Sequence, residues 1–391
     1  MKHYCSSLYI NNFELFCYID YQELLANFRG FNSKMGLFDY TESSQRVIFG
    51  EGSLSKLPDE LAKLNCTKPL ILTTPTKTSY VDDISKILNG QIAGSFTQVT
   101  MHTPKEVTEE ALKQLRSVDA DCVVSIGGGS AVGLGKALFV LTGLPHICIP
   151  TTYAGSEMTP IVGQTENRVK VTHIDRKAIP AVVIYDVNLT LTLPTNISAT
   201  SGLNAMAHAV EALYAQDANP ITSMFAIKGI QTLAGSLPQI MQNPRDLEAR
   251  SDALLGTWFC GKCLAGASVA LHHKLCHVLG GTFNLPHAET HAIILPHALA
   301  YIAPSIPSVM QELSDIIPDS NGDAVSGLNK LLSKLQITYS LKDLGLKEED
   351  IEVAVDNLLK KPFWNPRSVE RDPIRELLKR AWEGKPAQIE V

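Results

Sequence analysis

Six of the eleven histidines in this chain lie between residues 271 and 297, in the stretch LHHKLCHVLGGTFNLPHAETHAIILPH. Histidine is the side chain whose ordinary pKa lies nearest neutrality, so a group of histidines suits proton transfer, anion binding or metal ligation. His273 and His277 are four residues apart, which on a helix places both side chains on one face. The stretch therefore predicts a chemical site rather than part of a core.

Two neighbouring segments are predicted to complete this site. Gly280 and Gly281 are expected to end the first helix, so that His287, which follows a proline, can fold back towards it. Upstream, Asn204 and His208 are four residues apart on another amphipathic helix. Two helices that each turn polar groups inward are a common way to build a site in a helical domain.

A run of glycines ends the predicted buried strand DCVVSIGGG (121–129) and opens a helix. Without Cβ atoms this backbone can come close to a diphosphate, and the N–H groups at the helix start favour an anion. The spacing is not that of the GxGxxG fingerprint, and a tight turn alone would also explain the glycines. A second polar turn follows the strand HICIP (146–150), at the strand end where open α/β sheets bind ligands. The predicted cofactor-binding residues are Gly127, Gly128, Gly129, Ser130, Thr151, Thr152 and Ser156.

Strands and helices are predicted to alternate through the first half of the chain. Apolar runs such as PLILTT (69–74) indicate strands buried on both faces, and such alternation predicts a parallel sheet. Later segments read as helices, including 271–281 and 341–345. We expect a ligand cleft between the two parts. The predicted divisions are an extension (1–34), an α/β nucleotide-binding domain (35–194) and an α-helical catalytic domain (195–391).

Composition excludes several classes of function. The chain has 391 residues, 45% of them hydrophobic, and a net charge of -6, which argues against nucleic acid or an anionic membrane surface as a partner. The sequence contains no run of eighteen apolar residues, so no membrane span is predicted. Eight cysteines without a repeating frame predict reduced thiols and a cytoplasmic protein, and the single CxxC of Cys260 and Cys263 is too little for a zinc site. The first 34 residues carry no motif, and we expect them to be weakly ordered.

Three motifs carry a family resemblance. HHKLCHVLGG, LPHAETHAIILPHALAY and IPTTYAGSEMTPI resemble the maleylacetate reductase branch of the iron-containing alcohol dehydrogenase superfamily, with the likeness spanning roughly residues 41–390. The resemblance implies a dehydroquinate synthase-like architecture, with a Rossmann-like sheet domain before a helical domain. It also implies that both polar turns bind the nucleotide of NADH or NADPH.

The superfamily holds a divalent metal with one aspartate and three histidines. On that pattern the ligand positions fall at Asn204, His208, His277 and His287, so an asparagine stands in place of the aspartate. The branch is generally regarded as working without metal, and the loss of the one anionic ligand should weaken binding of a hard cation. We therefore expect that no metal is required. If one is present, His208, His277 and His287 are the expected ligands.

The resemblance further implies the reaction. Hydride would pass to the carbon–carbon double bond of maleylacetate, a small dicarboxylate in which that bond is conjugated to a ketone, and give 3-oxoadipate in the catabolism of aromatic compounds. The enolate that forms needs a hydrogen-bond donor, and the neighbouring carbon needs a proton. The predicted catalytic residues are His277 and His287, with His208 in support, and the predicted substrate contacts are Tyr153, His273 and Asn204. Lys136 is interpreted as a solvated surface lysine outside the site.

Three alternatives stay open from the sequence. They are a metal-dependent alcohol or polyol dehydrogenase of the same superfamily, a lyase of the dehydroquinate synthase type, and a non-catalytic binding protein, which the three retained site histidines disfavour. NADH and NADPH are not distinguished, because no clear ribose-binding acid follows the strand at 69–74. A homodimer is expected.

Overall fold

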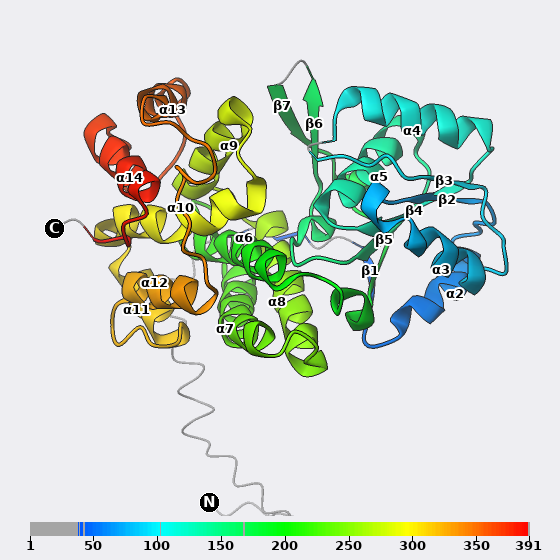
Figure 1. The fold of residues 1–391 in the computed structure, drawn as a ribbon, viewed down its shortest axis with the longest axis horizontal. Coiled ribbons are helices and arrows are strands. Elements are labelled where there is room, and N and C mark those ends of the chain that lie inside the picture. Colours follow the sequence, from blue (N-terminus) through cyan, green and yellow to red (C-terminus); the bar gives the residue numbers. More distant parts are fainter. Residues whose placement is uncertain (1–37, 39, 42–43, 102, 167–168, 390–391) are drawn as a thin grey trace, which may run out of the picture. The chain divides into compact units, whose positions relative to one another are not determined.

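A parallel sheet of six strands organises the first half of the chain, in the order β1-β8-β5-β4-β2-β3 (Figure 1). The computed structural model describes residues 38, 40–41, 44–101, 103–166 and 169–389, so the predicted extension at 1–34 lies outside the described residues. The strands are β1 (Arg46–Phe49), β2 (Pro69–Leu72), β3 (Gly94–Phe96), β4 (Cys122–Gly127), β5 (His146–Pro150) and β8 (Val182–Tyr185). All their pairings are parallel, as the alternation of strands and helices predicts.

Helices cover both faces of this sheet, which is why its strands are apolar without alternation. Along β4, Val124 and Ile126 pack on one face in a cluster with α3, while Val123 packs on the other face against Leu134 and Leu138 of α5. The helices are α2 (Leu57–Lys63), α3 (Ser79–Ile87), α4 (Lys105–Ser117) and α5 (Gly129–Thr142). A separate antiparallel hairpin is formed by β6 (Ile161–Glu166) and β7 (Val169–Ile174).

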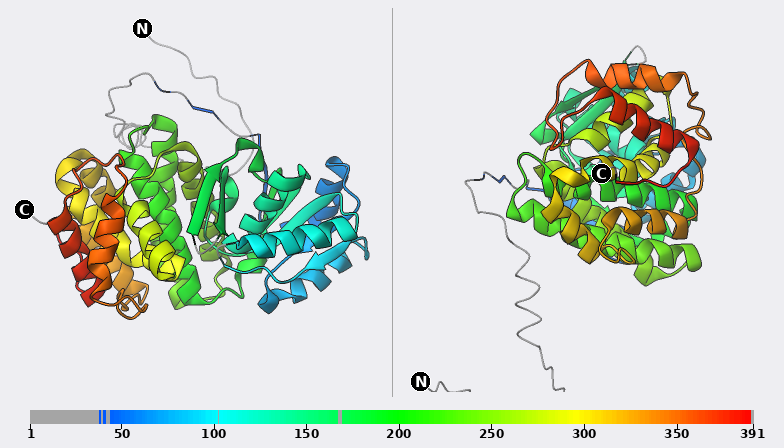
Figure 2. Two further views of the ribbon diagram at one scale, coloured as in Figure 1. Left: turned by 90° about the horizontal axis from the view of Figure 1, so that it is seen from above. Right: turned by 90° about the vertical axis from the view of Figure 1, so that its left-hand side faces the viewer.

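Helices alone make up the second half, visible beside the sheet in both Figure 1 and the left view of Figure 2. They are α6 (Thr195–Tyr214), α7 (Pro220–Gln242), α8 (Leu247–Gly266), α9 (Leu271–Phe283), α10 (His287–Ile302), α11 (Pro307–Ile316), α12 (Ala324–Lys334), α13 (Asp350–Leu359) and α14 (Arg371–Glu383). The predicted fold class, an α/β part with a parallel sheet followed by a helical part, is confirmed.

Two local predictions are wrong. The segment 341–345 forms turns rather than a helix. Helix α9 continues through Gly280 and Gly281 and ends at Phe283, and the next residue, Asn284, has a left-handed φ of 56°. Asparagine tolerates that conformation better than most residues, so Asn284 supplies the stop that the two glycines were expected to give.

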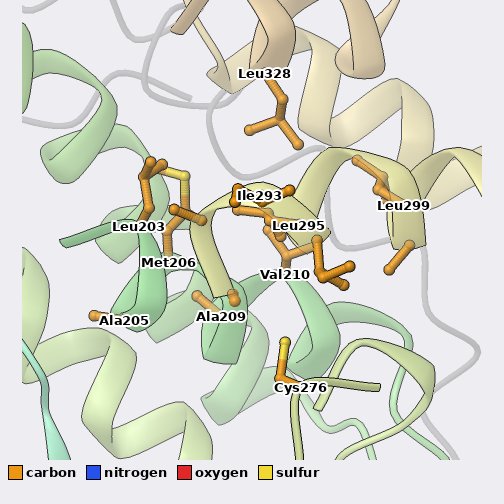
Figure 3. Close-up of a cluster of buried hydrophobic side chains, with 14 of the residues drawn as sticks. Leu203, Ala205, Met206, Ala209, Val210, Cys276, Ile293, Leu295, Leu299 and Leu328 are labelled. Carbon is orange, nitrogen blue, oxygen red and sulfur yellow. The ribbon is translucent and has the colours of Figure 1, made fainter. Parts of the chain in front are cut away.

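Helix α6 is the centre of the helical half. Its residues from Ser198 to Tyr214 are all buried, and many are small, which lets neighbouring helices approach closely. Figure 3 shows the side chains of Leu203, Met206 and Val210 from α6 gathered with Ile293 of α10 and other apolar residues. The same core also contains side chains of the sheet half, so the division at residue 194 marks a change of secondary structure across a continuous core.

Among the described residues, no single helix is long and apolar enough to cross a membrane. The pair α8 and α9 passes the length and composition criteria together, but it is bent by 95°.

Two buried histidines make the fold sensitive to acid. Burial, with a smaller effect of Lys136, lowers the pKa of His146 to about 3, and burial with Arg380 lowers that of His297 to about 4. The unfolded chain therefore binds more protons than the folded one below about pH 6.5. We expect the two together to remove about 4 kcal/mol of the free energy of unfolding between about pH 7 and pH 5. Denaturant titrations would show a shallower pH slope in His297→Asn, and an equal slope would contradict this account.

Candidate active site

The structure brings the predicted site histidines together from three helices. His208 of α6 stacks on His273 of α9, with ring centroids 4.9 Å apart, and the centroid of His277 lies 6.2 Å from that of His273. His208 also lies close enough to His277 and to His287, the first residue of α10, for their charges to act on it. The grouping predicted from spacing is therefore present.

The four histidines of this group differ in their exposure to solvent. His277 is exposed and His287 is half-buried, whereas the side chains of His208 and His273 are buried. Burial, followed by the charges of His273, His287 and His277, holds the pKa of His208 well below its usual range. His208 is therefore a neutral imidazole at physiological pH, and the two histidines that can meet a substrate from solvent are His277 and His287.

Helix α6 also contributes two unsatisfied polar atoms to the histidine group. Asn204 Oδ1 and His208 Nδ1 are buried and have no hydrogen-bond partner among the described residues. Buried polar atoms in native proteins are nearly always paired, so an unpaired one usually marks a site for a ligand, water or ion. A bound substrate or cation would satisfy both atoms.

Glu211 belongs to the site, although it was not singled out in the sequence. It lies three residues after His208 on α6, and its buried carboxylate accepts a 2.6 Å hydrogen bond from His273 Nδ1. The same carboxylate accepts from the backbone N–H groups of Ala270 and His272 at the start of α9. The signal in the sequence was its position, since residues i and i+3 share a helix face.

A second pair of histidines, His272 and His291, lies beside this group. His272 Nε2 and His291 Nδ1 are 3.0 Å apart, and Cys276 Sγ is 3.8 Å from the same His272 nitrogen. The ligand atoms of these three buried residues lie within 4.8 Å of one another. His272 Nδ1 and His291 Nε2 have no partner among the described residues, although a metal-bound histidine normally donates its other N–H. This arrangement favours a hydrogen-bonded supporting layer over a metal site.

The predicted nucleotide cradle is formed where β4 and β5 end side by side. Gly127 pairs in register with Pro150, and the N–H of Thr151 donates to the Gly127 carbonyl at 2.9 Å. Helix α5 starts at Gly129 with no side chain capping its N–H groups. The backbone there is open to an anion, as expected for a site that binds a diphosphate.

The two predicted nucleotide turns lie close together. A Cβ built on Gly128 would lie 3.0 Å from Thr152 Cγ2, so the opening between the two turns depends on glycine. Ser156 Oγ lies opposite, 3.7 Å from where a Cβ of Gly129 would stand, and has no partner among the described residues. Predicted cofactor residues from both turns therefore lie close together, with the Ser156 hydroxyl available to a ligand.

The second turn also joins the cradle to the histidine site. The N–H of Tyr153 donates to Ser201 Oγ at 3.4 Å, and Ser201 lies one turn before Asn204 on α6. The Tyr153 side chain points into the core instead, with its hydroxyl accepting from buried Arg250 at 3.2 Å. The side chain thus fixes the junction of the two halves, and a substrate contact for it stays a prediction.

The interpretation of Lys136 as a surface residue is wrong. Its side chain is buried, and Nζ donates to the carbonyl oxygens of Ser156 at 2.5 Å, Thr159 at 2.7 Å and Ile161 at 3.2 Å. Burial lowers its pKa to about 8. Lys136 therefore ties α5, which starts in the first nucleotide turn, to the end of the second turn. The apolar neighbours of Lys136 in the segment GLGKALFVL could have indicated that its side chain is buried.

Removing that tie should loosen the second nucleotide turn. Lys136→Met leaves buried carbonyls without a donor, which costs about 1–3 kcal/mol and corresponds to roughly a tenfold to hundredfold rise in KM for the nucleotide. Steady-state kinetics would measure this rise beside Lys113→Met, an exposed lysine of α4 that should change nothing. A normal KM for nucleotide in a folded Lys136→Met protein would contradict the assignment.

Other candidate features lie apart from this site. Cys260 and Cys263 are buried, and a Cβ on Gly229 of α7 would lie 2.7 Å from Cys260 Sγ, so the CxxC pair packs α8 against α7. A cavity of about 1120 Å³ lies near the beginning of β5 and the end of α8, lined by residues such as Phe139 and Ile174. None of the predicted site residues lines it.

The residues around His208 supply enough ligand atoms for a divalent cation, but this ligand set lacks the charge of a carboxylate. His208, His277 and His287 supply three imidazoles, which suffice for zinc, and His273 has the orientation of a metal ligand because Glu211 accepts from its Nδ1. Asn204 adds a neutral carboxamide oxygen where a carboxylate would supply charge. These residues could hold a borderline cation such as zinc, with weaker retention than a site that includes a carboxylate.

Comparison with known proteins matches nearly the whole described chain. The family models for iron-containing alcohol dehydrogenase and for the C-terminal part of Fe-containing alcohol dehydrogenases match residues 44–187 and 198–382. The maleylacetate reductase of Rhizobium sp. (strain MTP-10005) is 47% identical over 347 residues, which cover 89% of this chain and 98% of that protein. The maleylacetate reductase of Burkholderia cepacia is 47% identical over 350 residues, covering 90% and 99%.

Solved structures agree with the sequence matches. Maleylacetate reductase from Agrobacterium tumefaciens superposes with a TM-score of 0.86 at 46% identity, covering 90% of this chain and 100% of that one. An iron-containing alcohol dehydrogenase from Corynebacterium glutamicum gives 0.84 at 38% identity, covering 91% and 98%. Because the family is named for iron, the comparisons do not support the expectation that no metal is required. The chain is an oxidoreductase that belongs to the iron-containing alcohol dehydrogenase family, in its maleylacetate reductase branch.

Proposed function

We propose that this protein reduces the conjugated carbon–carbon double bond of maleylacetate to give 3-oxoadipate, with NADH or NADPH, in the catabolism of aromatic compounds. The observation that supports the proposal most is the 3.4 Å hydrogen bond from Tyr153 N–H to Ser201 Oγ, which joins the second predicted nucleotide turn to the helix that carries Asn204 and His208. The maleylacetate reductases that are 47% identical over 89–90% of the chain support the choice of substrate.

The site residues match what this reduction requires. A bound NADH or NADPH supplies the hydride. His277 and His287, which reach solvent, donate a hydrogen bond to the enolate oxygen and a proton to the carbon next to the ketone. His208 is neutral and buried, so it adds no positive charge behind the substrate. Asn204 Oδ1, which is an acceptor, and His208 Nδ1 have no partner among the described residues, so both are available to a ligand.

We further propose that the reaction does not depend on a metal ion. An alcohol dehydrogenase uses its metal to polarise a hydroxyl or carbonyl oxygen. An enolate beside His277 and His287 has hydrogen-bond donors of another kind, and Asn204 in place of a carboxylate weakens the ligand set. Exhaustive chelation should then leave maleylacetate reduction near its starting rate. Loss of activity that added zinc or iron restores would contradict metal independence.

A metal-dependent alcohol or polyol dehydrogenase is the second candidate. It is favoured by one observation: His273 donates from Nδ1 to Glu211, as histidine ligands of metals do with neighbouring carboxylates. Oxidation of NADH or NADPH with maleylacetate, compared with reduction of NAD or NADP by primary alcohols, separates the two. Turnover with alcohols alone would favour the dehydrogenase. Stoichiometric consumption of the nucleotide with maleylacetate would also exclude a lyase that only recycles its cofactor.

A homodimer in the cytoplasm completes the proposal. Ile174, at the cavity described above, is 73% exposed, and Leu141 of α5 is 51% exposed, so both offer apolar surface to a partner. A second copy of the chain would cover them. The described cysteines are free thiols, which fits a reducing compartment. Sedimentation of the wild type and of Ile174→Asp tests the dimer, and a monomeric wild type would contradict it.

A further inference from the structure

Glu211 is the one acidic group that reaches the histidine site from α6. Its side chain is buried, and four donors meet it: His273 Nδ1 at 2.6 Å, the N–H groups of Ala270 at 2.9 Å and His272 at 2.8 Å, and the Tyr214 hydroxyl at 3.3 Å. Burial raises the pKa of Tyr214 well above its usual range, so this hydroxyl keeps its proton and donates. The carboxylate is thus surrounded by donors on several sides.

We propose that Glu211 is a positioning residue that fixes His273 as the tautomer protonated on Nδ1 and that holds the start of α9 in place. An ionised carboxylate only accepts hydrogen bonds, so the bond at 2.6 Å requires the proton on Nδ1. His273 Nε2 is buried and has no partner among the described residues. The ring stacks on His208 with centroids 4.9 Å apart, and turning it over would break its bond to Glu211.

This arrangement connects three parts of the site through one side chain. Glu211 shares a helix face with Asn204 and His208, because the three lie at positions i, i+4 and i+7 of α6. Its two bonds to backbone N–H groups stop α9 from shifting along its axis, and α9 carries both His273 and His277. A small change at Glu211 would therefore move two histidines relative to the third.

The consequence for chemistry is a defined acceptor at Nε2 of His273. In this tautomer Nε2 carries no proton, and its lone pair is buried without a partner among the described residues. The other tautomer, protonated on Nε2, would present an N–H at that atom instead. The catalytic role of this acceptor rests on the proposed reduction, whereas the tautomer itself does not.

Nitrogen NMR of protein labelled with ¹⁵N-histidine tests the tautomer directly. The His273 resonances are assigned by their loss in His273→Gln, and the wild type should show Nδ1 protonated and Nε2 unprotonated. In Glu211→Gln the amide can donate as well as accept, so the ring should become a mixture of tautomers. A wild-type His273 protonated on Nε2, or an unchanged spectrum in Glu211→Gln, would overturn the proposal whether or not the protein reduces maleylacetate.

Kinetics test the effect on the reaction. Loss of a carboxylate that orients an active histidine typically costs 10-fold to 100-fold, so we expect Glu211→Gln to lower kcat by about that factor while KM for the nucleotide stays unchanged. Glu211→Asp keeps an acceptor and should recover part of the rate. Tyr214→Phe removes another donor to the same carboxylate and should leave kcat within about threefold, since its bond of 3.3 Å is the longest of the four. An equal loss in Tyr214→Phe and Glu211→Gln would show a purely structural role and overturn the proposal. If Glu211→Gln fails to fold, the wild-type spectrum and Glu211→Asp decide.

Discussion

His277→Ala and His287→Ala are each expected to lower kcat for maleylacetate reduction by at least about a hundredfold, with the protein still folded. These are the two site histidines that reach solvent, His277 being exposed and His287 half-buried. Removing a donor to a developing oxyanion, or a group that transfers a proton, typically costs on the order of 10²-fold to 10³-fold. Both act after the nucleotide is bound, so KM for NADH or NADPH should change little.

An exposed histidine outside the site provides the control for these variants. His173 lies on β7 of the hairpin, and His173→Ala should keep the wild-type kcat. Circular dichroism and thermal unfolding would show whether the site variants remain folded. A folded His277→Ala protein that keeps a normal kcat would remove His277 from the chemistry, and the same holds for His287→Ala.

Gly128→Val should nearly abolish binding of the nucleotide. A Cβ at this position lies 3.0 Å from Thr152 Cγ2 and 3.2 Å from its hydroxyl, so a branched side chain fills the gap between the two turns. The diphosphate would then lose close contact with the backbone at the start of α5, and a loss of about 3 kcal/mol corresponds to a rise in KM of more than a hundredfold. Isothermal calorimetry with NADH and NADPH measures the loss.

The matched control for this change is a glycine with free space around it. A Cβ on Gly235 of α7 meets no atom within 4 Å, so Gly235→Val adds the same side chain without blocking a ligand. It should bind the nucleotide as the wild type does. Normal affinity in Gly128→Val would show that the nucleotide lies elsewhere, and the assignment of both turns would fail.

The layout of the fold was predictable because burial leaves a direct trace in the sequence. Runs such as those that form β2 and β4 are apolar on both faces, and the strands do lie in the interior of a sheet covered on both sides. Helix ends were less predictable. Two glycines inside α9 predicted the end of the helix too early. The helix ends just before Asn284, which takes up a left-handed conformation that depends on the packing of the next segment.

The site was predictable where one helix carries the signal and unpredictable where distant segments meet. Spacing placed Asn204 and His208 together, but it could not show that Glu211 accepts from His273, 62 residues later. Lys136 illustrates the same limit, because its partners follow it by 20 to 25 residues and its burial depends on the turn folding back over α5. Tyr153 lay in a polar motif, yet its side chain pairs with Arg250, which no motif indicated.

Transfer of deuterium from labelled NADH or NADPH tests the central claim most directly. If the protein reduces a double bond conjugated to a ketone, mass spectrometry and NMR of the product should show one deuterium on the alkene carbon that lies β to the ketone of 3-oxoadipate. The neighbouring carbon should take its hydrogen from solvent, delivered by the histidines. Deuterium on a carbinol carbon, formed by reduction of the ketone itself, would contradict the account and indicate the chemistry of an alcohol dehydrogenase.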